Sequence, residues 1–183
     1  MNFKEYQSLA LVTNADLGSE KLNLAHMVIG MCSELNELET ALYNEDVVNI
    51  SEECTDEFWY LANFCTLLNI SLEEFDYTEK KRNPKFMRQD AFIFLTSAVS
   101  ELSDIVKKHI AYNKALDMKE VKKKVGKISS CLQEIYLIFN LDVQQGLQNN
   151  IDKLKVRFGG KFTEHAALNR DLEKELVELS KTN

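Results

Sequence analysis

Apolar residues recur at intervals of three and four along much of the chain, which is the spacing of one face of an α-helix. Two such stripes in the first half are Leu24, Met27, Val28, Met31, Leu35, Leu38 and Leu42, and then Phe58, Leu61, Ala62, Cys65 and Leu68. Polar residues at 43–46 and 49–51 separate the stripes, and Asn49 and Glu52 have the spacing of a capping box. The pattern therefore predicts two antiparallel helices joined by a short polar loop.

The composition extends this prediction to the whole chain. Its 183 residues include one Pro and six Gly, and 45% are hydrophobic and 28% charged, which favours an almost entirely helical protein. No apolar run approaches the roughly 20 residues of a membrane span, and the N-terminus lacks the charged-then-apolar order of a signal peptide. We therefore expect a soluble, cytoplasmic protein with no membrane partner.

The net charge and the types of possible metal ligand argue against nucleic-acid-binding, zinc-binding, disulfide-linked and di-iron proteins. The net charge of -7 argues against general nucleic-acid binding, so we interpret the basic cluster at 79–88 and the run Lys122-Lys123-Lys124 as solvated surface. No CxxC spacing is present, which favours buried free thiols over a zinc site or a disulfide framework at Cys32, Cys54, Cys65 and Cys131. No ExxH pattern accompanies the acidic residues, which argues against a di-iron bundle.

Four carboxylates in two pairs are the clearest chemical signal. Glu34 and Glu37 are three residues apart, as are Glu53 and Asp56, and 15 residues separate the pairs. Residues at i and i+3 share a helix face, so an antiparallel hairpin lets both pairs direct oxygen ligands at a common point. Hard cations such as Mg²⁺ favour a site made only of oxygen ligands. The spacing therefore predicts a magnesium site.

An alternative interpretation treats these carboxylates as part of a solvated acidic face. The run Glu52, Glu53, Asp56 and Glu57 fits that view, because acidic residues are common on helix surfaces. The position of Glu34 favours the metal site instead. It lies at the margin of an apolar stripe, where an unpaired carboxylate is strongly disfavoured and a bound cation compensates it.

Three segments of the sequence resemble one protein family. They are Ser33-Glu34-Leu35-Asn36-Glu37, Glu52-Glu53-Cys54-Thr55-Asp56-Glu57-Phe58-Trp59-Tyr60-Leu61 and Leu68-Asn69-Ile70-Ser71-Leu72-Glu73-Glu74. These segments resemble the MazG-type all-α nucleoside triphosphate pyrophosphohydrolases, whose signature is ExxE, a gap of about this size, and ExxD followed by Trp-Tyr. Ser33 departs from the family, because many members carry a further Glu there. Any role of that extra carboxylate is therefore not carried over.

The resemblance implies an all-α, MazG-like helical bundle with Mg²⁺, or alternatively Mn²⁺, as cofactor. The substrate would be a nucleoside triphosphate, split at its α-β phosphate bond into a nucleoside monophosphate and pyrophosphate. Metal would be held by Glu34, Glu37, Glu53 and Asp56. The catalytic acceptor of the water proton would be Glu37 or Glu53.

The tail of the chain extends the resemblance to substrate-binding residues. Asn150, Lys153 and Arg157 match the family's phosphate-side residues, and their spacing places all three on one helix face. They are followed by Lys161-Phe162 and by Ala167-Leu168-Asn169-Arg170-Asp171, which also match. Trp59 lies three residues after Asp56 and is expected either to wall the nucleoside pocket or to be a core residue.

The second half of the chain repeats features of the first. Ser33-Glu34-Leu35 recurs as Ser100-Glu101-Leu102, and Asn69-Ile70 recurs as Asn140-Leu141, with four extra residues expected in the loop at 112–119. The only Pro, in Asn83-Pro84-Lys85, should break the helix between the copies. We predict one domain over 1–183 made of two tandem helical-hairpin modules, 1–83 and 84–183. The hairpins form a four-helix core, and terminal helices, including one over 164–181, complete it.

The two copies differ in their charged residues. At an offset of 71 residues, Glu53 and Asp56 correspond to Lys124 and Lys127, which repel a cation rather than bind one. The phosphate-side residues are intact only in the second copy, since the matching segment of the first has Glu79 and Arg82. We therefore predict one composite site per chain, with metal ligands from 1–83 and phosphate-side groups from 84–183. Neutral drift of a redundant copy is the competing explanation.

Two other functions compete with the pyrophosphohydrolase. One is a catalytically reduced helical binding or regulatory protein derived from such an enzyme, and the other is a metal-dependent hydrolase of a different phosphate ester. The four intact carboxylates argue against the first. The sequence does not specify the base and sugar of the substrate, and it leaves both a monomer and a homodimer open.

Overall fold

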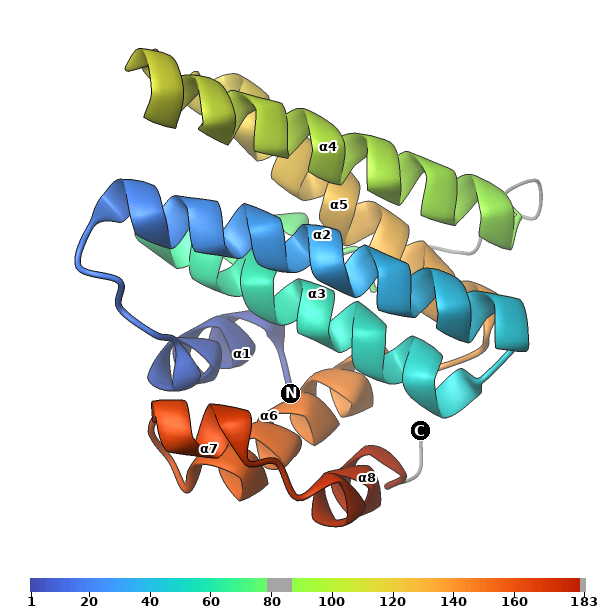
Figure 1. Ribbon diagram of the computed structural model, residues 1–183. Helices are drawn as coiled ribbons and strands as arrows, with labels where there is room; N and C mark the ends of the chain where they lie inside the picture. Colours follow the sequence, from blue (N-terminus) through green and yellow to red (C-terminus); the bar gives the residue numbers. More distant parts are fainter. Residues whose placement is uncertain (79–86, 182–183) are drawn as a thin grey trace.

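Every element that the structure describes is helical, as the computed structural model in Figure 1 shows. The structure describes residues 1–78 and 87–181, and no strand occurs within these ranges. The all-α prediction is thereby confirmed. In chain order the elements are α1 (Phe3–Ala10), η1 (Leu11–Thr13), α2 (Glu20–Asn44), α3 (Val47–Leu67), η2 (Leu72–Phe75), α4 (Arg88–Tyr112), α5 (Met118–Ile138), α6 (Val143–Phe158), α7 (Glu164–Leu168) and α8 (Leu172–Leu179).

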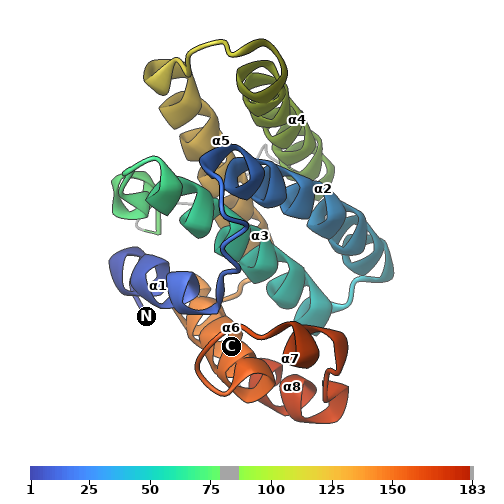
Figure 2. The ribbon, with the colours of Figure 1, turned by 60° about the vertical axis from the view of Figure 1, so that its left-hand side comes forward.

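Two long helical hairpins form the centre of the molecule. The hairpin of α2 and α3 packs against that of α4 and α5, with α2 beside α4 and α3 beside α5. Figures 1 and 2 show α1 and α6 on the opposite side of α3 from α4 and α5, with α7 and α8 next to α6. The C-terminal elements therefore lie against the first hairpin, although they follow the second in sequence.

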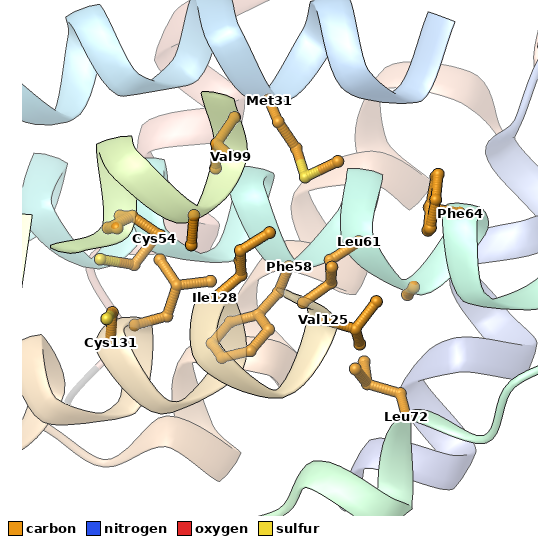
Figure 3. Packing of buried hydrophobic residues seen from close by; sticks show 14 of the residues in the cluster. Met31, Cys54, Phe58, Leu61, Phe64, Leu72, Val99, Val125, Ile128 and Cys131 are labelled. Atoms are coloured by element: carbon orange, nitrogen blue, oxygen red, sulfur yellow. The ribbon is translucent and has the colours of Figure 1, made fainter. Parts of the chain in front are cut away.

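The apolar stripes of the sequence form the core between these helices. Buried side chains from α2, α3, α4 and α5 meet in one cluster, part of which Figure 3 shows. Members labelled there are Met31, Cys54, Phe58, Leu61, Phe64, Leu72, Val99, Val125, Ile128 and Cys131. Burial of this apolar surface holds the two hairpins together and fixes which face of α2 and α3 remains available for polar groups.

The two hairpins have helices of equal length. α2 and α4 each have 25 residues, and α3 and α5 each have 21. α2 and α4 both end at a residue with positive φ, Glu45 and Asn113, and Asn69 and Asn140 have the same conformation after α3 and α5. The connection between α4 and α5 is residues 113–117, three residues longer than 45–46 rather than the predicted four. The division into two modules stays a prediction, and Asn83-Pro84-Lys85 lies outside the described residues.

Two predicted helix boundaries are wrong. The loop of the first hairpin is shorter than expected, because Asp46 rather than Asn49 caps α3 and accepts a hydrogen bond from the Asn49 backbone N–H at 3.2 Å. The expected helix over 164–181 is divided into α7 and α8. Asp171 interrupts it, because its side chain accepts from the Lys174 backbone N–H and caps a new helix there.

The structure also bears on the predictions for the cysteines and for membrane-spanning segments. All four thiols are free, and Cys54, Cys65 and Cys131 are buried as expected, whereas Cys32 is exposed. None of the described helices combines the length and the apolar character that crossing a bilayer requires.

Candidate metal centre and adjoining cavity

Three of the four predicted metal ligands converge between α2 and α3. Glu34 and Glu37 come from α2 and Glu53 from α3, and each offers a carboxylate oxygen within 4.8 Å of the others. Glu53 is only 8% exposed, whereas Glu37 is exposed to solvent. Within 1–78 and 87–181 this is the only group of three or more such ligands. Its donors are all oxygens, the set that Mg²⁺ and Mn²⁺ prefer over zinc or copper.

The electrostatics of these carboxylates fit a site for a cation. Burial, followed by the charges of Asp56 and Glu37, raises the pKa of Glu34 to about 7. Burial and the charges of Asp56 and Glu52 raise the pKa of Glu53 to about 9. Burial first, and then the nearby carboxylates, disfavour the charged form of these groups, so without a cation they favour their protonated forms. A divalent cation supplies the neutralising charge, so the donor set suits a resident metal.

Asp56, the fourth predicted ligand, contacts a lysine instead. Lys153 Nζ lies 2.7 Å from both oxygens of Asp56 and 3.2 Å from Glu52 Oε1, and the side chain of Lys153 is 0% exposed. Asn150 Nδ2 donates to Asp56 Oδ1 at 2.5 Å. The ammonium group thus lies between two carboxylates of α3, about 100 residues earlier in the chain.

Tyr6 of α1 contacts Asn150 on the side away from Asp56. Its hydroxyl lies 2.8 Å from Asn150 Oδ1 and 2.9 Å from the carbonyl oxygen of Thr55. Burial, and then the charge of Asp56, raises the pKa of Tyr6 well above its usual range, so the hydroxyl keeps its proton and donates. Because the oxygens of the Asp56 carboxylate only accept, the amide of Asn150 turns its nitrogen to Asp56 and its oxygen to the Tyr6 hydroxyl. Asp56 is therefore held by residues of both α1 and α6.

Arg157, the third predicted phosphate-side residue, binds a carboxylate of α8. Its Nε donates to Glu175 Oε1 at 3.0 Å and its Nη2 to Oε2 at 2.5 Å. Arg170 donates to the same Oε2 through Nη2 at 2.7 Å and Nε at 3.2 Å. Glu175 is 2% exposed, and these contacts lower its pKa even though burial alone would raise it.

A cavity of about 580 Å³ adjoins the carboxylates. It lies among α2, α3, α6 and the C-terminal helices, and its volume is within the usual range for small-molecule sites. Its lining has three chemical parts: the acidic groups of α2 and α3, two guanidinium groups, and aromatic rings. The residues concerned are Glu34, Glu37, Glu52, Glu53 and Asp56, then Arg157 and Arg170, then Trp59, Tyr60, Phe158 and Phe162.

Trp59 lines this cavity and is not enclosed in the core. Its indole Nε1 donates to Thr13 Oγ1 at 3.0 Å, and its ring meets that of Tyr60 edge to face, with 4.9 Å between centroids. Tyr60 in turn packs over Gly30 of α2, where an added Cβ would stand 2.0 Å from the Tyr60 ring. Gly30 therefore lets α2 approach α3 closely enough to hold Tyr60 at the cavity wall.

Glu57 does not belong to a solvated face. It is fully buried behind the site, and neither of its carboxylate oxygens has a hydrogen-bond partner among the described residues. Burial, and then the charge of Glu34, raises the pKa of Glu57 well above the usual carboxyl range. Its surroundings therefore favour the protonated form over the charged one.

The second hairpin neutralises its own carboxylates with lysines. Lys124 of α5 forms an ion pair with Glu101 of α4, and Lys107 and Lys108 bind Asp104. These contacts lie on the surface of α4 and α5, away from the cavity. A lysine ammonium thus stands beside Glu101, and that lysine, Lys124, is the residue that corresponds to Glu53 in the predicted repeat.

The structure brings together the residues predicted for the site, but with different contacts. Asn150 and Lys153 contact Asp56, and neither lines the cavity, so their assignment to substrate stays a prediction. Arg170 lies in a segment that resembles the family but has no predicted role there, and the sequence pattern does not indicate Glu175. The position of Glu175 could have indicated a role, because it lies four residues before Leu179 and therefore on the same face of α8. That face is buried, and a buried charged residue requires a partner.

Comparison of the chain with family models, with curated proteins and with solved structures finds no match in any of the three. The MazG-type resemblance therefore rests on the sequence motifs alone.

Proposed function

We propose that this protein is a Mg²⁺-dependent nucleoside triphosphate pyrophosphohydrolase of the MazG type. The observation that carries the proposal is the convergence of Glu34, Glu37 and Glu53 at a cavity that also presents guanidinium groups and aromatic rings. These are the three kinds of group that a nucleotide requires, namely ligands for its metal ion, cations for its phosphates and flat surfaces for its base.

The acidic residues would hold the metal. Glu34, Glu37 and Glu53 supply the converging oxygens, and Asp56 lies one helical turn after Glu53 on the same side of α3. When bound, Mg²⁺ or Mn²⁺ would link these carboxylates to phosphate oxygens and acidify the attacking water. In this assignment Lys153 and Asn150 position Asp56 and limit the repulsion among the carboxylates.

The opposite wall would hold the rest of the substrate. Arg157 and Arg170 are the guanidinium groups of the cavity and would bind phosphate oxygens in the bidentate manner typical of arginine. Trp59 and Tyr60 would contact the nucleoside through their rings. This arrangement agrees with the predicted composite site, because the metal ligands come from 1–83 and the arginines from 84–183.

The reaction requires one proton acceptor at the carboxylate cluster. Water attacks the α or β phosphorus, the oxygen bridging them leaves with the other phosphoryl group, and a nucleoside monophosphate and pyrophosphate result. Glu37 and Glu53 are the candidates to accept the water proton. Glu37 is the more accessible to water, whereas burial and the neighbouring charges raise the pKa of Glu53 to about 9.

A pyrophosphate-release assay separates this enzyme from a helical binding protein of the same descent. The protein would be incubated with Mg²⁺ and each of the common ribo- and deoxyribonucleoside triphosphates, with the Glu53→Gln variant as a control for contaminating hydrolases. We expect pyrophosphate and the monophosphate in equal amounts from at least one substrate, and none with Glu53→Gln. Absence of product from every triphosphate, with no Mg²⁺ binding by calorimetry, would overturn the proposal.

A further inference from the structure

Glu175 lies where a bound anion would be expected. Its carboxylate accepts a two-bond fork from Arg157 and further hydrogen bonds from Arg170, and Oε2 alone receives three N–H groups at 2.5–3.2 Å. Two guanidinium groups around one oxyanion are the arrangement that arginine also makes with phosphate. Both arginines line the same cavity as Glu34, Glu37 and Glu53. A carboxylate of the chain itself therefore fills an anion position beside the candidate metal centre.

The helix that carries Glu175 packs along α6 but has few buried side chains. Of its eight residues, only Glu175 and Leu179 are buried. Its C-terminal end is also held by Asn149, whose Nδ2 lies 3.4 Å from the Leu179 carbonyl oxygen and 2.9 Å from that of Lys181. A helix of eight residues is not stable alone in water, so α8 depends on its packing against α6 and on these polar contacts to stay docked. The connection to α6 passes through Gly159 and Gly160, both with positive φ, a conformation that glycine adopts freely.

We propose that Arg157 and Arg170 form the binding site for the phosphate chain of the substrate, and that Glu175 occupies this site as an internal competitor until polyphosphate displaces it. The inference rests on the proposed function, because it names the groups of the same cavity that bind the substrate's anion. A polyphosphate brings several charges and can engage both arginines and the metal centre at once, whereas Glu175 brings one charge. Displacement of Glu175 also releases α8 from its main buried contact.

The competition distinguishes substrate from product. A tethered carboxylate acts at a high effective concentration, so a ligand must bind both arginines strongly to replace it. A triphosphate meets this requirement better than a monophosphate. After hydrolysis, the return of Glu175 to the arginines favours departure of the products.

Calorimetry with inorganic tripolyphosphate in the absence of divalent cations tests the inference. Glu175→Gln removes the competing charge, and we expect it to tighten tripolyphosphate binding by about tenfold, the factor for a site occupied by Glu175 in about nine molecules of ten. Glu173→Gln is the matched control, because it removes the same charge from an exposed position of the same helix and should change the affinity by less than about twofold. Equal or weaker binding by Glu175→Gln would overturn the inference.

Hydrogen exchange on the unmodified protein gives a second test that does not depend on how the variant folds. Saturating tripolyphosphate should speed exchange of the α8 backbone amides, because Glu175 leaves the arginines, while exchange in α3 stays unchanged. Slower exchange in α8 would show that the anion stabilises the docked position of this helix, and would also overturn the inference. Neither test requires turnover, so the pyrophosphohydrolase proposal and the internal competitor fail on different measurements.

Discussion

Lys153 has no exposed side-chain surface, yet it is a charged residue in the interior. Burial alone would lower its pKa, but Asp56 and Glu52 raise it above the usual lysine value, so the ammonium group stays charged. Asp56 and Glu52 are themselves mostly buried. At the scale of the residue, this pairing is what allows an acidic cluster to stand beside the protein core.

Replacement of Lys153 by methionine tests this arrangement. The substitution keeps the volume but leaves Asp56 and Glu52 without their partner, and we expect it to lower the free energy of unfolding by about 3–5 kcal/mol. Urea denaturation followed by circular dichroism measures the change. Lys155→Met is the control, because Lys155 forms an exposed pair with Asp152 and should cost no more than about 1 kcal/mol. Similar stabilities for the two variants would contradict the role given to Lys153.

Sequence spacing predicts which residues meet at the site better than it predicts what each one contacts. The i, i+3 rule places Glu34 and Glu37 on one face of α2, and the structure brings both to Glu53. The same rule cannot tell that Asp56 contacts Lys153, since its partner belongs to a helix about 100 residues away. Glu57 shows the same limit, because its burial depends on the packing of α2 onto α3 and not on its neighbours in sequence.

At the scale of the element, the approach of α2 to α3 depends on one glycine. Gly30 faces the ring of Tyr60, which forms part of the cavity wall. The hydrophobic periodicity is sufficient to predict both helices, but it carries no information about this contact. For the terminal helices the helix prediction itself was wrong. One helix was expected over 164–181, but Asp171 caps a second one within that range.

Gly30→Ala should displace the Tyr60 ring. The added methyl group overlaps the ring, so we expect a loss of about 1–3 kcal/mol in stability and weaker nucleotide binding. A double-mutant cycle with Tyr60→Ala is the control, with stability measured by urea denaturation. In the Tyr60→Ala background the ring is absent, and Gly30→Ala should be neutral or stabilising because alanine favours the helix. Equal losses in both backgrounds would show that Tyr60 is not the cause.

The two hairpins should also differ in their contribution to activity. Glu53 lies in the carboxylate cluster of the first hairpin, whereas Glu101 of the second pairs with Lys124 on the surface. We expect Glu53→Gln to lower kcat/KM for the triphosphate substrate by at least about 100-fold, because it removes a metal ligand. Glu101→Gln should retain most of the activity. Comparable losses in the two variants would mean that the chain has a second working site.

At the scale of the whole molecule, the site joins segments from both ends of the chain. α1 supplies Tyr6, α2 and α3 supply the carboxylates, and α6 supplies Asn150 and Lys153. Local patterns predict the helices, but the docking of α1 and α6 against α3 depends on the complete fold. The oligomeric state, monomer or homodimer, stays a prediction, because contacts within one chain do not determine it. The cytoplasmic location stays a prediction as well.

Metal binding should therefore stabilise the whole fold. Mg²⁺ at about 100 times its dissociation constant should add about 2.7 kcal/mol to stability, because only the folded chain assembles the site. For a protein of this size that amounts to a rise in Tm of roughly 5–10 °C by calorimetry. Glu101→Gln should keep this rise and Glu53→Gln should lose it. A rise of equal size in both variants would place the bound ion elsewhere.

The contacts of Asp56 with α6 also bear on how the protein is made. During synthesis α3 leaves the ribosome long before Lys153, so for that interval Glu52 and Asp56 lack the cation that lies between them in the folded protein, beside Glu53. Their mutual repulsion opposes a tight docking of α3 until the last part of the chain arrives. The acidic cluster thus ties completion of the first hairpin to translation of the final helices, and a chain truncated before α6 would keep that hairpin loose.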